Sequence, residues 1–253
     1  MPNYRVDLEY DGSRFHGWQA QPGETRTVQG ELQCALATLC GTGVRVVGAG
    51  RTDAGVHALG QVASFKIEEE KEPQRFLRGL NALLPCDVRA HRLQIVPDDF
   101  SARTSALWRR YAHALPGAVD VQAMAAATAF IVGDHDFTAF ARSDSAGVDR
   151  CCRVLDAHLD TDTHLVRFEI TANRFLHNMV RRLAGAIVEV GRGRFVPGKL
   201  AEILQTGDTS RGGPCLPACG LFLLEVRYPD DSEDAGGPAP VPARLVDAGP
   251  GAP

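Results

Sequence analysis

Apolar and polar residues alternate along Tyr4–Tyr10 with the period of two that predicts a half-buried β-strand. Between Thr27 and Cys40 apolar residues recur at helical spacing, and Thr27 is placed to cap that helix at its N-terminus. The other elements predicted in the first half are strands over 44–47, 62–67, 88–96 and 108–115, and a short helix over 76–84 that ends before Pro85.

The second half of the chain repeats this mixture. Alternating runs on both sides of residues 161–163 predict a β-hairpin, and the last strand is expected over 221–228. Helices are predicted over 121–132, 175–190 and 197–204. Because some strands are joined by hairpins and others by helices, we expect an α+β fold, with a mixed, mostly antiparallel sheet in two similar halves and flanking helices. The seam is expected near residue 97, which gives halves of 1–97 and 98–228.

Residues 229–253 are predicted to be a disordered acidic tail, because Gly, Pro, Ala and Asp dominate there and core-forming residues are almost absent. The net charge of the chain is −4. Five of the 31 acidic and one of the 27 basic residues lie in the tail, so residues 1–228 carry 26 of each. A neutral body can still present a basic cleft to a nucleic acid, and arginine pairs such as Arg109–Arg110 and Arg181–Arg182 are candidates for it.

The bulk composition is that of a globular enzyme of the cytoplasm. Hydrophobic residues make up 44% of the chain, yet no apolar run approaches the length of a membrane span, and the first residues lack the layout of a signal peptide. The seven cysteines lie mostly inside periodic segments, which indicates reduced thiols. Neither Cys215 with Cys219 nor Cys151 with Cys152 has the paired spacings of a zinc site, so no metal is expected.

The most informative segment is the glycine-bracketed loop from Gly50 to Gly55, which carries one acid, Asp53, two residues after Arg51. Glycines let such a turn adopt backbone conformations that expose a reactive side chain, although any hairpin turn can use them in the same way. A nearby guanidinium keeps a carboxylate ionised, as a nucleophile requires. The loop lacks the Gly-Lys-Ser/Thr ending of a phosphate-binding loop.

Several blocks of sequence accompany this loop in a fixed order and resemble the tRNA pseudouridine synthase A family. The resemblance runs across residues 4–228, and separate blocks in this order are very improbable by chance. The blocks are Gly50–Phe65 itself, Glu9–Ser13, Phe15–Gln21, Thr27–Gly30, Phe100–Arg103, Arg109–Tyr111, Asp136–Phe140, Phe175–Arg181, Glu189–Gly191 and Gly220–Leu223.

The resemblance implies a role for each of five residues. Asp53 is the catalytic nucleophile, and Arg51 beside it helps to hold the flipped nucleotide. Tyr111 stacks on the target uracil, Arg181 pairs with Asp53 from a long helix, and Leu221 packs on the other side of the base. Taken alone, Tyr111 and Leu221 suit core positions and Arg181 suits a solvated helix position.

The resemblance also implies a pseudouridine synthase fold with a central active-site cleft and a tRNA uridine isomerase. The enzyme would act at positions 38, 39 and 40 in the anticodon stem-loop, as a homodimer and without a cofactor. A non-catalytic tRNA-binding or chaperone protein is the alternative, but binding alone needs no acid facing a polyanion. A metal-dependent nuclease requires several clustered carboxylates, and Asp53 is the only candidate that the sequence provides.

The chain departs from the family pattern between Tyr111 and Asp136, where the family usually has a longer insertion. Residues 116–120 lead almost directly into a helix here, so a loop that could extend along the RNA is shortened. Arg110 also stands where some relatives have an aromatic residue.

Overall fold

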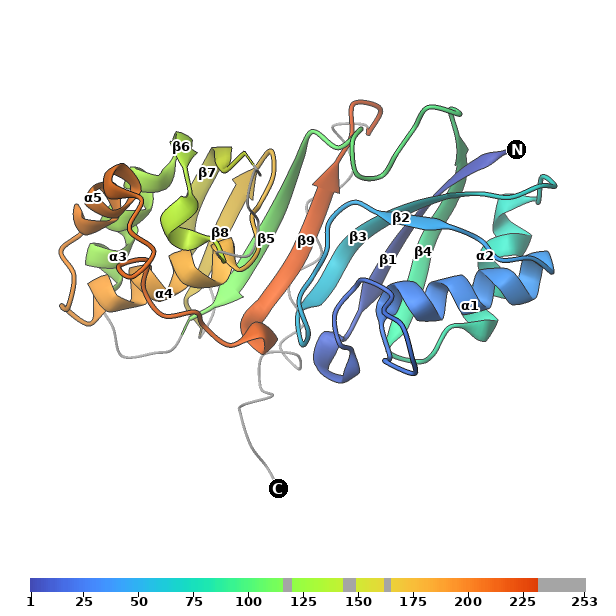
Figure 1. Ribbon diagram of the computed structural model, residues 1–253, viewed down its shortest axis with the longest axis horizontal. Helices are drawn as coiled ribbons and strands as arrows, with labels where there is room; N and C mark the ends of the chain where they lie inside the picture. Colours follow the sequence, from blue (N-terminus) through green and yellow to red (C-terminus); the bar gives the residue numbers. More distant parts are fainter. Residues whose placement is uncertain (116–119, 143–148, 162–164, 232–253) are drawn as a thin grey trace, which may run out of the picture. The chain divides into compact units, whose positions relative to one another are not determined.

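The computed structural model describes residues 1–115, 120–142, 149–161 and 165–231. These residues form two compact units: unit 1 is Met1–Leu107 with the described chain from Phe222 on, and unit 2 is Trp108–Leu221. Each unit combines helices with mostly antiparallel strands (Figure 1), so the predicted α+β class is confirmed.

In unit 1 the strands lie in the order β4–β1–β3–β9. The central strand β1 pairs antiparallel with both β3 and β4, and β9 runs parallel to the start of β3. The short β2 pairs antiparallel with the end of β3. The bounds are β1 (Asn3–Tyr10), β2 (Val46–Gly48), β3 (His57–Lys66), β4 (Val88–Val96) and β9 (Leu221–Arg227).

Helices α1 (Val28–Cys40) and α2 (Pro73–Leu83) lie side by side in unit 1 (Figure 1). The Phe76 ring of α2 packs edge-on against Tyr4 and Phe65, which stack on each other with their centroids 5.6 Å apart. The predicted cap is confirmed, because the Thr27 side chain accepts a hydrogen bond from the Gly30 N–H at 3.2 Å. A buried aromatic cluster therefore joins the sheet to α2.

Unit 1 extends ten residues beyond the expected seam at residue 97. The side-chain amide of Asn3 donates to the carbonyl oxygens of Pro97 and Phe100 at 2.8 and 2.9 Å, and Leu107 N–H donates to Arg227 O at 2.8 Å. These long-range hydrogen bonds tie the segment after β4 to the first unit, and local sequence patterns do not report them.

In unit 2 four antiparallel strands follow the order β5–β8–β7–β6. The predicted hairpin is confirmed as β7 and β8, although residues 162–164 of its turn lie outside the described chain. The four-residue β6 was not predicted because its sequence, GDHD, has no apolar alternation. The bounds are β5 (Trp108–Ala114), β6 (Gly133–Asp136), β7 (Cys151–Asp160), β8 (Arg167–Ala172), α3 (Val121–Thr128), α4 (Met179–Gly191) and α5 (Lys199–Thr206).

Helix α4 begins at Met179, four residues later than predicted. Asn178 has φ 64°, a left-handed conformation that cannot continue into a right-handed helix. The apolar pattern nevertheless continues upstream, because Phe175 packs against Tyr111 outside the helix. None of the helices in the described ranges is long and apolar enough to cross a membrane.

The first residues of the expected tail are part of unit 1, which corrects the predicted start of disorder at residue 229. The Arg5 guanidinium donates to Asp231 at 2.6 Å and to Asp7 at 2.7 Å, and it lies 4.5 Å from the centroid of the Tyr228 ring. Arg5 and Asp231 side chains are only 7% and 11% exposed. The local composition predicts disorder from residue 229, but this long-range ion pair holds Asp231 against unit 1. Residues 232–253 lie outside the described chain.

We therefore predict that a chain ending at Pro229 is less stable than one ending at Asp231. Removing Asp231 leaves part of a buried guanidinium without its acceptor, at a cost of about 1–3 kcal/mol. Thermal unfolding of both truncated proteins and of the full chain measures the effect. The protein ending at Asp231 should match the full chain, and equal midpoints for all three would show that the Arg5–Asp231 pair contributes nothing to stability.

Candidate active site

Arg51 and Asp53 lie on the loop between β2 and β3 in unit 1. Arg51 is exposed and Asp53 is half-buried. The Val56 N–H donates to Asp53 O at 3.1 Å, and Gly55 has φ 81°, so the chain reverses immediately after the acid. This turn leaves the carboxylate partly accessible and fixes the backbone that carries it.

A buried hydrogen-bond group anchors the residue before the acid. The Tyr10 hydroxyl lies 2.8 Å from the Thr52 hydroxyl, and the Gln61 side-chain amide donates to Tyr10 and to Gly50 O at 3.3 and 3.0 Å. Burial raises the pKa of Tyr10 to about 12, so its hydroxyl keeps its proton at neutral pH. Because each of these groups is satisfied inside the protein, the loop has one preferred position.

Residues 12–18, here called the strap, hold the other side of the Asp53 loop. Trp18 N–H donates to Thr52 O at 3.0 Å, and Gly55 N–H donates to Phe15 O at 3.3 Å. Gly17 has φ 89°, and a Cβ added there would lie 2.7 Å from Thr52 O. The strap overlaps two motif blocks, Glu9–Ser13 and Phe15–Gln21, to which the sequence assigned no role. Its hydrogen bonds to Thr52 and Gly55 supply one, because they hold the loop before and after Asp53.

Tyr111, Arg181 and Leu221 belong to unit 2. Tyr111 lies on β5, is 7% exposed, and meets the Phe175 ring edge-on with centroids 5.0 Å apart. Arg181, in the first turn of α4, donates through Nε to Leu216 O at 2.7 Å. The Leu216 N–H donates back to Arg181 O at 3.2 Å. Arg181 therefore fixes the segment that leads into Leu221.

His113 was not singled out from the sequence, yet it supports the same segment. Its ring nitrogens lie 2.7 Å from Ala114 O and 3.1 Å from Pro217 O. Burial lowers the pKa of His113, and the nearby Arg181 charge acts in the same direction. His113 stands two residues after Tyr111, so the two side chains share one face of β5. This spacing of two residues from Tyr111 is the feature of the sequence that could have identified His113.

The structure thus assembles the predicted residues in two groups. Arg51 and Asp53 share a loop in unit 1. In unit 2 Arg181 contacts the segment that leads into Leu221, and Tyr111 contacts Phe175. Arg110, noted as a departure from the family, precedes Tyr111 on β5. The shortened segment 116–119 lies outside the described chain, and Asp120 after it caps α3 through its carboxylate.

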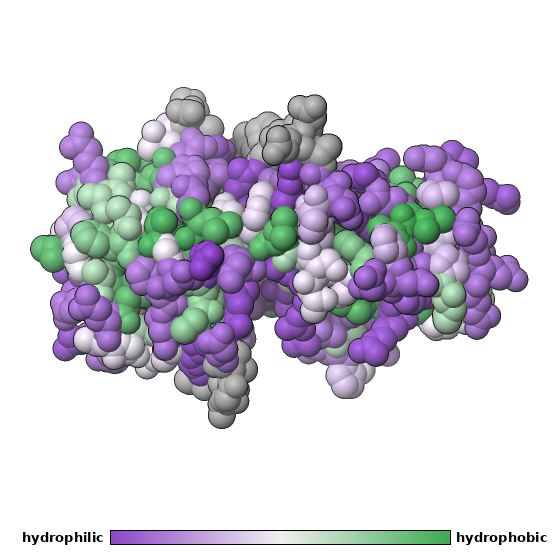
Figure 2. All heavy atoms as spheres, turned by 90° about the horizontal axis from the view of Figure 1, so that it is seen from above, coloured by the Kyte–Doolittle hydropathy of each residue, from purple (hydrophilic) through white to green (hydrophobic). Residues whose placement is uncertain are grey.

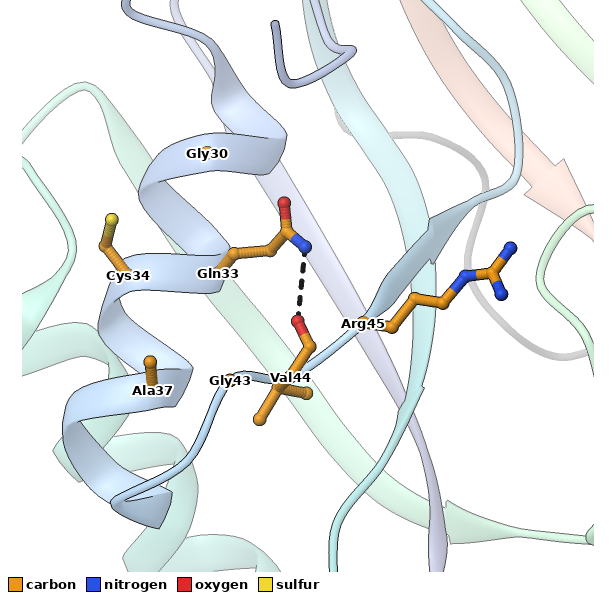
Figure 3. Close-up of a pocket in the computed structure, with 7 residues that line it drawn as sticks. All are labelled: Gly30, Gln33, Cys34, Ala37, Gly43, Val44 and Arg45. Atoms are coloured by element: carbon orange, nitrogen blue, oxygen red, sulfur yellow. Dashed lines mark hydrogen bonds between the residues drawn. The ribbon is translucent and has the colours of Figure 1, made fainter. Parts of the chain in front are cut away.

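Figure 3 shows a surface pocket elsewhere in unit 1, between α1 and the segment that enters β2. The Gln33 amide donates to Val44 O at 3.2 Å across its floor. Its lining shares only Gly30 with the motif blocks and includes none of the predicted site residues. The full lining is Gly30, Gln33, Cys34, Ala37, Gly43, Val44 and Arg45. Within the described residues, no group of three or more His, Cys, Asp or Glu side chains is arranged to hold a metal ion.

Comparison with known proteins decides the family. The family model described as tRNA pseudouridine synthase matches residues 8–104 and 126–229. The chain belongs to the tRNA pseudouridine synthase family. The match includes the Asp53 loop, Arg181 and Leu221, whereas Tyr111 falls between its two segments. Family membership confirms the resemblance drawn from the motif blocks and the enzyme class, an isomerase.

Curated relatives named tRNA pseudouridine synthase A share this family and nearly the full length. The protein of Caldicellulosiruptor bescii is 38% identical over 245 residues, covering 90% of this chain and 100% of the relative. That of Pelodictyon phaeoclathratiforme is 41% identical with the same coverage. The protein of Azorhizobium caulinodans is 38% identical and covers 94% of this chain and 99% of its own. The chain therefore spans the whole length of these synthases.

The strap generates a prediction for this synthase. Gly17→Ala should lower turnover by about tenfold or more, because the added methyl group meets Thr52 O and displaces the Asp53 loop. Gly23→Ala is the matched control: Gly23 has φ 86°, so the backbone strain is similar, but an added Cβ meets nothing within 4 Å. Initial rates on tRNA compare the two variants. Equal losses would mean that backbone strain alone is responsible.

Proposed function

We propose that this synthase converts uridine to pseudouridine at positions 38, 39 and 40 in the anticodon stem-loop of tRNAs, with Asp53 as the nucleophile. The supporting observation is that a family match over most of the chain coincides with a half-buried acid on a loop held from both sides. We further propose that the enzyme works in the cytoplasm.

The chemistry accounts for the types of residue. The N1–C1′ bond of uridine must break, the uracil must rotate, and C5 must bond to C1′. C5 then loses its proton to solvent and N1 gains one, so the product is an isomer of the substrate. Cleavage develops oxocarbenium-like charge on the ribose, as in glycoside hydrolysis, and a carboxylate at the sugar stabilises that charge. The carboxylate then either attacks C1′ or removes the C2′ proton. No oxidation occurs and no group enters, so we expect neither a cofactor nor a metal to be required.

The remaining residues handle the base. The target nucleotide must leave its stack, which costs a few kcal/mol. Tyr111 stacks on the detached uracil, at about 1–3 kcal/mol per stacked base, and Leu221 closes the opposite side. Arg51 contacts the flipped nucleotide, and Arg181 is the catalytic arginine of unit 2. A non-catalytic tRNA-binding protein would not need the rigid attachment of Asp53 through Thr52 and Gly55.

Asp53→Asn should abolish pseudouridine formation and leave the fold and tRNA affinity nearly unchanged, because asparagine keeps the shape and loses the charge. Tritium release from C5-labelled uridine in tRNA, assayed with EDTA and without added cofactor, measures turnover. Asp98→Asn replaces an exposed acid of unit 1 and serves as the control. Turnover of Asp53→Asn within about tenfold of the wild type would remove the assignment, since this corresponds to a barrier change under about 1.4 kcal/mol.

We also propose that the synthase is a homodimer. Figure 2 shows apolar side chains at the surface of unit 2, and Phe130, Val132 and Leu155 are 41%, 40% and 47% exposed there. Gly133 pairs with Val154 between β6 and β7, and Val132 and Leu155 are the residues next to this pair in sequence. An exposed apolar patch on a sheet edge favours association with a second copy.

The double variant Val132→Glu/Leu155→Glu should therefore shift the protein towards monomers, because it places charge in the apolar contact. Leu83→Glu changes a similarly exposed leucine on α2 and should leave the dimer intact. Light scattering over a range of concentrations measures the mass. A wild-type monomer at the working concentration of the enzyme would contradict the dimer, and a persistent dimer in the double variant would move the contact elsewhere.

A further inference from the structure

Arg26 lies just before α1, and its guanidinium group contacts two carboxylates. Its two terminal nitrogens donate to the two carboxylate oxygens of Asp87, both at 2.8 Å, and its Nε donates to Glu31 at 2.9 Å. Its guanidinium carbon also lies 4.2 Å from the centroid of the Phe15 ring. The hydrogen bonds to Asp87 raise the pKa of Arg26, so the group is always charged. The planar guanidinium is thus fixed on three sides.

These contacts fasten the strap to the rest of unit 1. His16 N–H donates to Arg26 O at 2.9 Å, and Asp11 N–H, just before the strap, donates to Asp87 O at 3.0 Å. Arg26 and Asp87 therefore hold the strap through their main chains and hold each other through their side chains. The Phe15 ring, only 3% exposed, is covered by the Arg26 guanidinium.

Phe15 connects this ion pair to the Asp53 loop. Its carbonyl oxygen accepts the hydrogen bond from Gly55, two residues after Asp53, at 3.3 Å. The contacts run from Asp87 to Arg26, from Arg26 to the Phe15 ring, and from the Phe15 main chain to Gly55. All of them lie within unit 1.

We propose that Arg26, held by Asp87, is a positioning residue that fixes the Asp53 loop through Phe15. The proposal rests on the proposed function, in which Asp53 reacts with the nucleotide. A reacting group must be held to within about 0.5 Å of its productive position by the residues behind it. A displacement of about 1 Å costs up to 10²-fold in rate. Arg26 thus acts on the chemical step and not on tRNA binding.

The test compares three single variants and one double variant with a matched control. Arg26→Gln removes the charge and the pair of hydrogen bonds to Asp87. Arg26→Lys keeps the charge over the Phe15 ring but loses this pair of hydrogen bonds. Asp87→Asn weakens the same pair of hydrogen bonds by changing the acceptor. The control is Arg153→Gln, because Arg153 makes a similar two-oxygen contact with Asp134 between β7 and β6, remote from the strap in sequence. The readouts are the single-turnover rate at saturating tRNA, the Kd for tRNA, and hydrogen exchange of residues 50–58.

Arg26→Gln should lower the single-turnover rate by about tenfold or more, leave Kd within about threefold, and speed exchange in residues 50–58 but not in β4. Arg26→Lys should lie between it and the wild type. The combined Arg26→Gln/Asp87→Asn variant should be little worse than Arg26→Gln, because the two residues act as one unit. Arg153→Gln should change none of the three readouts.

Three outcomes for Arg26→Gln would overturn the proposal. The first is an unchanged single-turnover rate, and the second is a lower rate without faster hydrogen exchange in residues 50–58. The third is faster exchange throughout unit 1, which would show that the Arg26–Asp87 pair has only a structural role. Failure of the proposed function looks different. In that case the wild type forms no pseudouridine, or Asp53→Asn keeps its activity, whereas the exchange of residues 50–58 in Arg26→Gln still reports whether the ion pair holds the loop.

Discussion

The hydrogen bonds between the strap and the Asp53 loop are the constraint on which the position of Asp53 depends. A reactive carboxylate on a surface loop has little packing to hold it, so the main chain around it must be fixed instead. Trp18 N–H donates to Thr52, Phe15 O accepts from Gly55, and Tyr10 with Gln61 fixes Thr52 from the sheet. Backbone hydrogen bonds suit this task because their geometry is fixed by the chain itself.

Unit 2 uses the same device on a different segment. Arg181 exchanges two hydrogen bonds with Leu216, and His113 lies against Pro217 O. Both side chains belong to regular elements, β5 and α4, whose own positions are set by buried apolar faces. The segment that precedes Leu221 is thereby positioned by rigid elements although it has little regular structure of its own.

Much of the fold was predictable because its elements follow simple periods. The alternation of Tyr4–Tyr10 and the spacing of α1 with its Thr27 cap report local geometry, and the structure confirms them. The failures have different causes. β6 lacks alternation, and α4 starts late because of the backbone of Asn178. Asp231 is held by Arg5, more than two hundred residues away in sequence, and a window of sequence does not contain that contact.

The candidate site shows the same division between chemistry and support. The roles of Asp53 and Arg51 were inferred from the resemblance to the family, and they stay predictions. The long motif around them was explained only by the contacts of the fold: Gly17 is small because Thr52 O lies where its Cβ would be, and Phe15 is aromatic beneath the Arg26 guanidinium. A signature of this length therefore encodes one half-buried acid together with the larger set of residues that keeps it in place.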